Sequence, residues 1–445
     1  MRKEREALPL ESILMTDRLK EMKLYKGNII YTQEPKHFEI IENGYIGVED
    51  GKVTGVYEVL PECLCGAEII DWGNKLLIPA MNDVHVHAPQ YRNLGIAMDL
   101  ELLPWLDNYT FPEEVKYADV SYAKRMYSRF VRDLWRNGTM RAAAFATVHK
   151  ESTRVLMELF RKAGMGAYVG KVDMNRNCPD SLCESAADAV RDNEELIMEY
   201  GGRDTLVKPI ITPRFIPSCT PDMLSACGKL AQQYGLPVQS HLSENLNEIA
   251  WVRELEPESK NYGDAYNRYG LFGQTPTIMA HCIWTEGEEL ELMRKNGVMV
   301  AHCPTSNMNL SSGMAPIRTF MDAGLRIGLG SDISGGHDLS IFKVMVYAVE
   351  VSKMHYQRNK QTSFLSLSEA FWLATKSGGS FFGKVGSFEE GYDFDALVID
   401  DHELNYDHYS LQHRLERFIY LGDDRQIERR YCRGIEIEEP EIAES

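Results

Sequence analysis

Two histidines lie at the end of an apolar run, in the stretch DVHVHAPQY that spans residues 83 to 91. On a β-strand, residues i and i+2 point to the same face, roughly 7 Å apart. Two rings at that spacing can both reach one metal ion at bond lengths of about 2.0–2.1 Å. Twelve histidines in 445 residues give about 0.3 such pairs by chance, so His85 and His87 alone do not establish a metal site.

Three further side chains that can bind a metal stand at the ends of other apolar runs. His241 ends one run, His281 ends the next, and Asp332 follows the sequence GLGS. Each has a structural alternative, because histidines near a rim are often satisfied by neighbours and Gly-Ser-Asp is a common turn. Taken together with His85 and His87, they predict a metal site. Nitrogen and carboxylate ligands without thiolate favour zinc, with iron or manganese as alternatives.

A carboxylate that could move protons follows one of these histidines. Glu244 lies three residues after His241, just beyond the end of the run. From that position it can reach a metal-bound water without binding the metal itself. The alternative is an acidic residue favoured at a helix N-terminus by the helix dipole. We expect Glu244 to take part in catalysis.

Four other residues are weaker candidates. His149-Lys150-Glu151 matches the H-x-E of the cytidine-deaminase type of zinc enzyme, but the P-C-x-x-C that completes that site is missing. We interpret His149 as a rim histidine and His302 as a packed one, with a supporting position beside the metal as the alternative for His302. Lys208 lies inside its run, so a lysine bridging two metals is not expected. His337 could approach a substrate, but the pattern favours no such role.

These residues belong to a repeating pattern between about residues 79 and 385. Helical stretches such as SYAKRMYSRFVRDLWRNG, with apolar residues at spacings of three and four, separate successive apolar runs. The runs are KLLIPAMNDVHVH, MRAAAFATVH, GMGAYVGKVDM, LVKPIITPRF, LPVQSHLSEN, TPTIMAHCIW, GVMVAHCPTSN and LRIGLGSDIS. Eight such units predict a (β/α)8 barrel, in which reactive side chains gather at the carboxyl ends of the strands.

Short strand-like segments flank the barrel on both sides. Residues 23–78 and 386–437 predict one small β-sandwich domain built from both termini. Residues 1–22 are interpreted as an N-terminal extension, and residues 438–445 as an acidic, disordered tail. The predicted fold class is therefore α/β, with the catalytic barrel at 79–385.

Amino-acid composition limits which partners and which cellular location are expected. The chain is 44% apolar and 26% charged, and its net charge of −18 disfavours nucleic acid and anionic membranes as partners. No apolar run approaches the roughly 18 residues of a membrane helix, and MRKEREALPL leads into no signal-peptide core. A cytoplasmic location is the default expectation. The nine cysteines, none spaced as CxxC, are expected to be reduced thiols.

The order of DVHVH, SHLSE, AHC, AHCPTSN and GLGSD resembles the amidohydrolase superfamily, from about residue 27 to residue 435. The stretches HAPQY, DNYTFPEE and PRFIPSC, with YVGKVDMN in support, are similar to its guanine deaminase family. The resemblance implies a homodimer and one zinc ion per subunit, with iron(II) as the alternative. The implied ligands are His85, His87, His241 and Asp332. The chain departs from the family at Ala80, where glycine is commoner, and in the residues before Lys23.

The resemblance also implies that Gln90, Arg214 and Phe215 hold a purine, with His241, Glu244 and Asp332 completing the substrate contacts. The chemistry of guanine fits these side chains. Phe215 offers a stacking face, and Arg214 is a permanent cation with donors for a carbonyl oxygen. Gln90 can both donate and accept hydrogen bonds, as a ring edge that carries both donor and acceptor atoms requires. The alternatives are that Arg214 pairs with an acid and that Phe215 belongs to the core.

The implied reaction is the hydrolysis of guanine to xanthine and ammonia. We expect hydroxide to attack C2 while Asp332 takes the proton of the water and Glu244 protonates the ring nitrogen beside C2. His281 would orient the attacking oxygen and stabilise the tetrahedral intermediate. An aminohydrolase acting on 8-oxoguanine, a thioether nucleoside, cytosine or a triazine is the nearest alternative. A non-catalytic barrel scaffold is a more distant one.

Overall fold

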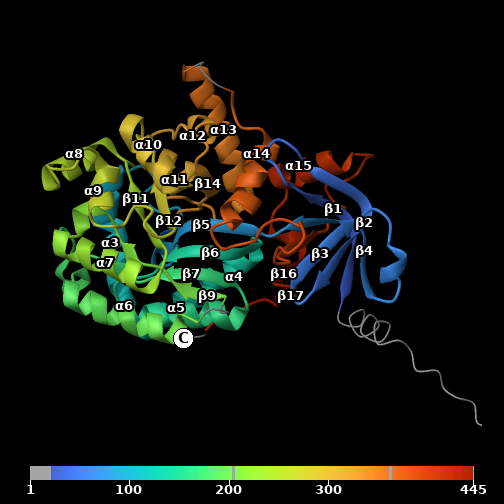
Figure 1. The fold of residues 1–445 in the computed structure, drawn as a ribbon, viewed down its shortest axis with the longest axis horizontal. Coiled ribbons are helices and arrows are strands. Elements are labelled where there is room, and N and C mark those ends of the chain that lie inside the picture. Colours follow the sequence, from blue (N-terminus) through green and yellow to red (C-terminus); the bar gives the residue numbers. More distant parts are fainter. Residues whose placement is uncertain (1–21, 203–205, 360–362, 444–445) are drawn as a thin grey trace, which may run out of the picture.

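A computed structural model of the chain describes residues 22–202, 206–359 and 363–443. The predicted N-terminal extension, apart from Met22, therefore lies outside the described residues. One part of the molecule has helices packed around parallel strands, and the other is a sheet at its side (Figure 1). Within the described ranges, no helix has the length and apolar character that crossing a bilayer requires.

Two four-stranded parallel sheets lie at the centre of the larger part. The first is formed by β5 (Met81–His87), β6 (Thr139–Phe145), β7 (Gly166–Gly170) and β9 (Val207–Pro209), and the second by β11 (Val238–Leu242), β12 (Thr277–His281), β13 (Met299–His302) and β14 (Arg326–Leu329). Every residue of β5 and β6 is buried, as expected for parallel strands covered on both faces. The α/β class with parallel strands is thus confirmed.

Backbone hydrogen bonds join the two sheets on both sides. Gln239 N donates to Ile211 O at 3.0 Å, just beyond β9. Asp332 N donates to His85 O at 2.9 Å, where the chain leaves β14 beside β5. A short parallel pair, β8 (Val172–Asp173) and β10 (Thr212–Pro213), extends the region beyond β7 and β9. The carboxyl ends of the strands therefore face one side of the molecule.

Helices follow the strands and surround them (Figure 1). One long helix is α4 (Val120–Arg136). Its N-cap is Asp119, whose side chain accepts a hydrogen bond from Ser121 N at 2.8 Å. Its apolar face, including Tyr127 and Phe130, joins the main core. The other α-helices of the described residues are α2 (Leu102–Trp105), α3 (Phe111–Glu114), α5 (Lys150–Ala163), α6 (Ala186–Tyr200), α7 (Pro221–Tyr234), α8 (Leu246–Leu255), α9 (Tyr262–Arg268), α10 (Gly287–Asn296), α11 (Pro304–Asn309), α12 (Ile317–Asp322), α13 (Ile341–Asn359), α14 (Leu367–Trp372) and α15 (Leu411–Leu421).

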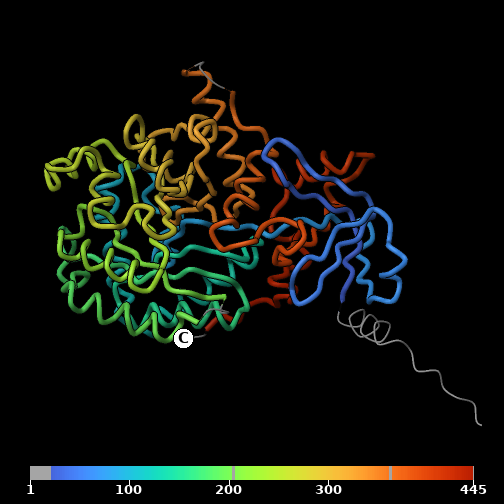
Figure 2. Tube along the Cα trace, viewed as in Figure 1, coloured from blue at the N-terminus to red at the C-terminus, as the bar shows by residue number. Residues whose placement is uncertain are grey.

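Strands from both ends of the chain form the second part, a mixed seven-stranded sheet in the order β17-β16-β15-β4-β1-β2-β3. These are β1 (Lys23–Tyr31), β2 (Glu39–Glu49), β3 (Lys52–Tyr57), β4 (Glu68–Pro79), β15 (Ala396–Ile399), β16 (Ile427–Cys432) and β17 (Ile435–Glu436). Figure 2 shows the blue N-terminal and red C-terminal traces side by side there. The described strands of this part belong to one seven-stranded sheet, and the β-sandwich stays a prediction.

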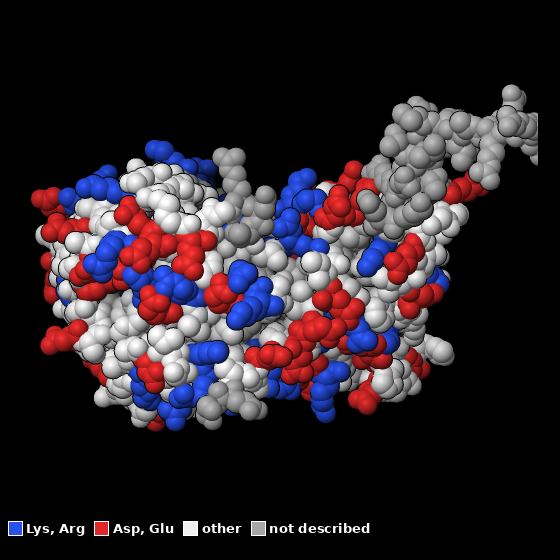
Figure 3. All heavy atoms as spheres, turned by 90° about the horizontal axis from the view of Figure 1, so that it is seen from below, with Lys and Arg blue, Asp and Glu red and all other residues white. Residues whose placement is uncertain are grey.

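A buried ion cluster connects the two parts. Arg141 on β6 donates to Asp395 at 2.6 Å and to Asp393 at 3.0 Å, just before β15. The acidic tail, predicted to be disordered, has no regular structure at 438–443 but lies along α4, where Ala443 N donates to Ser128 Oγ at 3.0 Å. Acidic and basic side chains are interspersed over the face seen in Figure 3.

Candidate active site

The structure brings the five predicted metal-binding and proton-transfer residues of the strand ends together. His85 and His87 end β5, His241 lies near the end of β11, and His281 ends β12. Asp332 follows β14 by three residues. Because neighbouring parallel strands end on the same side, these side chains meet although 247 positions separate the first from the last.

The distances between their polar atoms are short. His87 Nε2 lies 3.1 Å from His241 Nε2. Asp332 Oδ1 lies 3.1 Å from His85 Nε2 and 3.4 Å from His87 Nε2. The three histidines each offer a nitrogen within 4.8 Å of the others. This is the spacing expected of ligands arranged around one cation.

Burial gives these side chains the protonation states that a divalent cation needs. Both nitrogens of His85 and Nδ1 of His87 are buried without a hydrogen bond, which is unusual for polar atoms. Burial lowers the pKa of His85, and lowers the pKa of His87 and His241 well below the usual value. Burial alone would raise the pKa of Asp332, but the histidines around it outweigh that effect and hold it low. Neutral imidazoles and an ionised carboxylate fit a zinc ion.

Cys303 also lies within reach of His85 and Asp332. Burial raises the pKa of its thiol well above the usual value, and its Sγ lies 3.6 Å from Ala301 O. A metal ligand must be a thiolate. The three histidines with Asp332 are therefore the better set.

Hydrogen bonds orient two of the rings. His241 Nδ1 lies 2.6 Å from Arg214 O, a carbonyl that can only accept, so Nδ1 carries the proton and Nε2 is free for a metal. His281 Nδ1 lies 2.8 Å from Asn307 Oδ1, and its Nε2 lies 3.4 Å from Glu244 Oε2. Burial lowers the pKa of His281, but the carboxylates of Glu244 and Asp332 outweigh this effect and raise it.

Glu244 is buried at the edge of the same cluster. Burial raises its pKa to about 7, and its Oε1 accepts a hydrogen bond from Ser312 Oγ at 3.0 Å. Its own backbone N–H donates to Glu248 Oε2 at 3.1 Å, next to the cap of α8. A carboxyl group with a pKa near 7 can take up and release a proton at neutral pH.

A cavity of about 440 Å³ opens beside this cluster. An apolar wall comes from Leu102 and Trp105 of α2 and from Leu106, the first residue of a π-helical turn. The predicted metal-binding, proton-transfer and base-holding residues that line it are His87, Gln90, Arg214, Phe215, His241, Glu244, His281 and Asp332.

The three residues predicted to hold a purine all line the cavity, and Gln90 and Arg214 share a partner, Glu114. Arg214 does pair with an acid, Glu114, at 2.7 Å. The Nε2 of Gln90 donates to the other oxygen of Glu114 at 3.1 Å, and Gln90 Oε1 accepts from Ser334 N at 3.1 Å. Phe215 lines the cavity and packs edge to face against Trp251.

Sequence reasoning assigned no role to Glu114, Glu248, Asn307 or Ser312. Glu114 stands in DNYTFPEE, one of the stretches similar to the guanine deaminase family, but it contacts Arg214 across 100 positions of the chain. The spacing of residues within one helix or strand cannot predict a contact between segments so far apart. The resemblance of the stretch was the one signal available.

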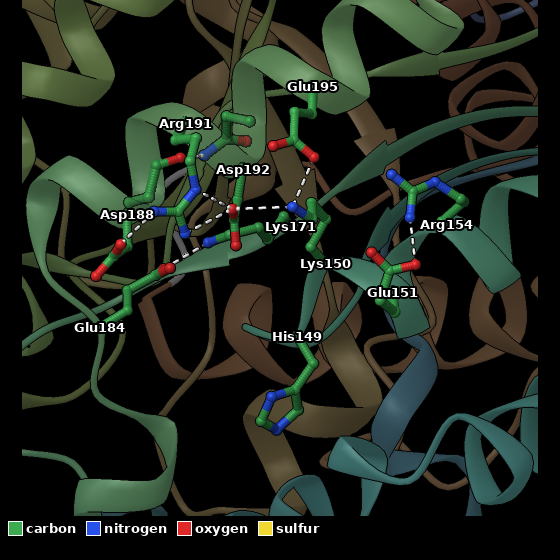
Figure 4. Close-up of polar contacts among 12 residues, drawn as sticks. His149, Lys150, Glu151, Arg154, Lys171, Glu184, Asp188, Arg191, Asp192 and Glu195 are labelled. Carbon is green, nitrogen blue, oxygen red and sulfur yellow. Dashed lines mark hydrogen bonds and ion pairs between the residues drawn. The ribbon is translucent and has the colours of Figure 1, made fainter.

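The four weaker candidates do not line the cavity. His149 occupies the N-cap position of α5 without a capping hydrogen bond from its side chain, and its ring points away from the ion pairs of α5 and α6 (Figure 4). His302 is buried, and burial lowers its pKa to about 3. Lys208 lies within β9, and His337 is exposed beside Tyr347.

The chain is similar to known proteins along most of its length. The profile of the amidohydrolase family matches residues 76–436. Guanine deaminase of Dictyostelium discoideum is 38% identical over 444 residues, covering 94% of this chain and 98% of that protein. Guanine deaminase of Escherichia coli K12 is 35% identical over 410 residues, covering 88% of this chain and 91% of that protein. A crystal structure of guanine deaminase from C. acetobutylicum with guanine bound in the active site is 56% identical, with a TM-score of 0.92 over 94% of this chain and 100% of that chain.

Proposed function

The chain belongs to the amidohydrolase family and, within it, to the guanine deaminases, and from this we propose that it hydrolyses guanine to xanthine and ammonia. One observation carries the proposal. The histidines, Asp332 and Glu244 converge at the strand ends beside a cavity that Gln90, Arg214 and Phe215 also line. A relative of 56% identity holds guanine in its active site, which supports the same substrate here.

We propose zinc as the metal, bound by His85, His87, His241 and Asp332. Close contacts between Asp332 and the rings of His85 and His87, together with the lowered pKa of the Asp332 carboxylate, support this ligand set. Zinc, when bound, lowers the pKa of water toward 7 and so makes hydroxide available at neutral pH.

The side chains of the protein supply the remaining chemistry. Gln90 and Arg214 hold the edge of guanine while Phe215 stacks on its face. Asp332 accepts a proton from the attacking water, and Glu244 delivers a proton to the ring nitrogen beside C2 as the carbon–oxygen bond forms. His281 orients the attacking oxygen and stabilises its charge. Asp332 then passes the proton that it took from water to the amino group, the carbon–nitrogen bond breaks, and ammonia leaves. The hydroxyl on C2 gives its proton back to Glu244 as the carbonyl of xanthine forms.

We also propose that the two parallel sheets are halves of one (β/α)8 barrel. The hydrogen bonds between Gln239 and Ile211 and between Asp332 and His85 support closure on both sides. The seven-stranded sheet would fold over its own core, formed by Tyr25, Ile29, Phe388, Phe394 and their neighbours, as a small β-sandwich does. The homodimer and the cytoplasmic location stay predictions.

The decisive experiment is an assay of guanine hydrolysis with metal content measured on the same sample. We expect ammonia and xanthine in equal amounts, one zinc per chain, loss of activity after chelation, and recovery when zinc is returned. Parallel assays with 8-oxoguanine, cytosine, a thioether nucleoside and a triazine test the alternatives. Faster ammonia release from any of these than from guanine would reject the proposed substrate.

A further inference from the structure

Gln90, Arg214 and Phe215 form what is here called the base-holding wall of the cavity. We propose that Glu114 is a specificity-determining positioning residue that keeps this wall free of net charge. This inference rests on the proposed function, because it concerns how the same cavity distinguishes its substrate from its product. Guanine enters as a neutral base. Xanthine is the stronger acid of the two, and it becomes an anion in mildly alkaline solution. A wall with an unpaired cation would hold that anion and slow its release.

The charge on this wall comes from Arg214. Its side chain is 4% exposed and that of Glu114 is 2% exposed, so the pair is almost entirely removed from water. The guanidinium also lies 5.1 Å from the ring of Phe111, which precedes Glu114 by one turn of α3. One short helix thus fixes the guanidinium through two contacts and supplies the charge that balances it.

The second contact of Glu114 determines how Gln90 is oriented. The amide nitrogen of Gln90 donates to Glu114, and its oxygen accepts from Ser334 N. Because its nitrogen and its oxygen are both hydrogen-bonded, the Gln90 amide cannot rotate by half a turn. The positions of its donor and of its acceptor in the cavity are therefore fixed. The remaining N–H and lone pair of Gln90 then meet the substrate in one arrangement only. A change at Glu114 should therefore alter both the charge and the hydrogen-bond pattern of the wall.

The test compares Glu114→Gln with Glu113→Gln in the zinc-loaded enzyme. Glu113 is equally buried on the same helix, but its partners are Lys116, Tyr122 and Arg92, which do not line the cavity. We measure kcat and KM for guanine and the inhibition constant of xanthine from about pH 7 to pH 9. For Glu114→Gln we expect the guanine KM to rise by at least about tenfold, with a smaller fall in kcat. Xanthine should inhibit this variant more strongly as pH rises, while Glu113→Gln follows the wild type.

The outcomes distinguish a failure of the proposed function from a failure of the role proposed for Glu114. If the wild type does not hydrolyse guanine, the proposed function fails. If it does, and Glu114→Gln has the KM and the xanthine pH profile of Glu113→Gln, the role of Glu114 fails alone. An equal loss of guanine and xanthine binding at every pH would indicate a merely structural residue and would also overturn it. Should Glu114→Gln not fold, Glu114→Asp decides, because it keeps the charge. It should raise KM without strengthening xanthine inhibition at high pH.

Discussion

At the scale of single residues, burial determines what each side chain of the site can do. Glu244 is an ordinary acid in the sequence, but burial raises its pKa to about 7. His85 and His87 are kept neutral by the same effect, which leaves their nitrogens available to a metal. The residue types determine which reactions are possible, and burial shifts the pKa values of these side chains to suit those reactions.

Replacing Glu244 tests its proposed role in proton transfer. Glu244→Gln keeps the shape of the side chain and its contact with Ser312 but cannot deliver a proton. We expect kcat to fall by about 10²–10⁴-fold, with zinc content unchanged. Steady-state kinetics and metal analysis on one preparation measure both quantities. Glu288→Gln, on the exposed surface of α10, is the control, and a kcat of Glu244→Gln equal to that of this control would remove Glu244 from the mechanism.

His302 should make the protein sensitive to acid. Its pKa is about 3 in the folded state because it is buried, and about 6.5 when unfolded. Between these pH values the unfolded chain binds more protons, so stability falls as the pH is lowered from about 6.5 toward 3. We expect His302→Gln to lose less stability over this window than the wild type. Urea unfolding at several pH values gives the slopes, and identical slopes would contradict the expectation.

At the scale of elements, local patterns account for the strands and long helices. Buried strands such as β12 and β13 are short apolar runs that end in a histidine, and α4 shows apolar residues at helical spacing. The cavity wall is different, since α2, the turn Leu106–Thr110 and α3 are each four or five residues long. Such short segments have no periodicity to read, and sequence reasoning did not predict them as elements.

The start of α4 offers a test of a local signal. Asp119→Ala removes the acceptor that caps the helix, and the free energy of unfolding should fall by about 1 kcal/mol. Asp119→Asn keeps an acceptor of equal quality and should be close to the wild type. Urea unfolding measures the difference, and kcat should be unchanged in both variants. Equal stabilities for the Ala and Asn variants would show that this cap does not stabilise the helix.

At the scale of the whole molecule, a few buried charges join the parallel-strand part to the seven-stranded sheet. Arg141 is the central one, with 6% of its side chain exposed and Asp395 beside it at 1%. Removing one partner of a buried pair leaves the other charge without compensation.

Arg141→Met should therefore lower the free energy of unfolding by about 3–5 kcal/mol. Arg136→Met provides a matched control, because Arg136 pairs with Asp424 on the surface with 46% of its side chain exposed. Exposed pairs contribute about 0–1 kcal/mol. Denaturant unfolding of the zinc-loaded proteins compares them, and similar losses in the two variants would mean that the buried cluster does not hold the parts together.

The sequence by itself determined the α/β class, the family, and the strand ends at which the histidines and Asp332 stand. These are local properties, because an apolar run and the residue that ends it can be read within about ten positions. Only the tertiary structure decided that Arg214 is paired with Glu114, that Glu244 contacts His281 and Ser312, and that the terminal strands belong to one sheet. Contacts of this kind depend on the path of the backbone between distant segments, and no spacing within a single element encodes that path.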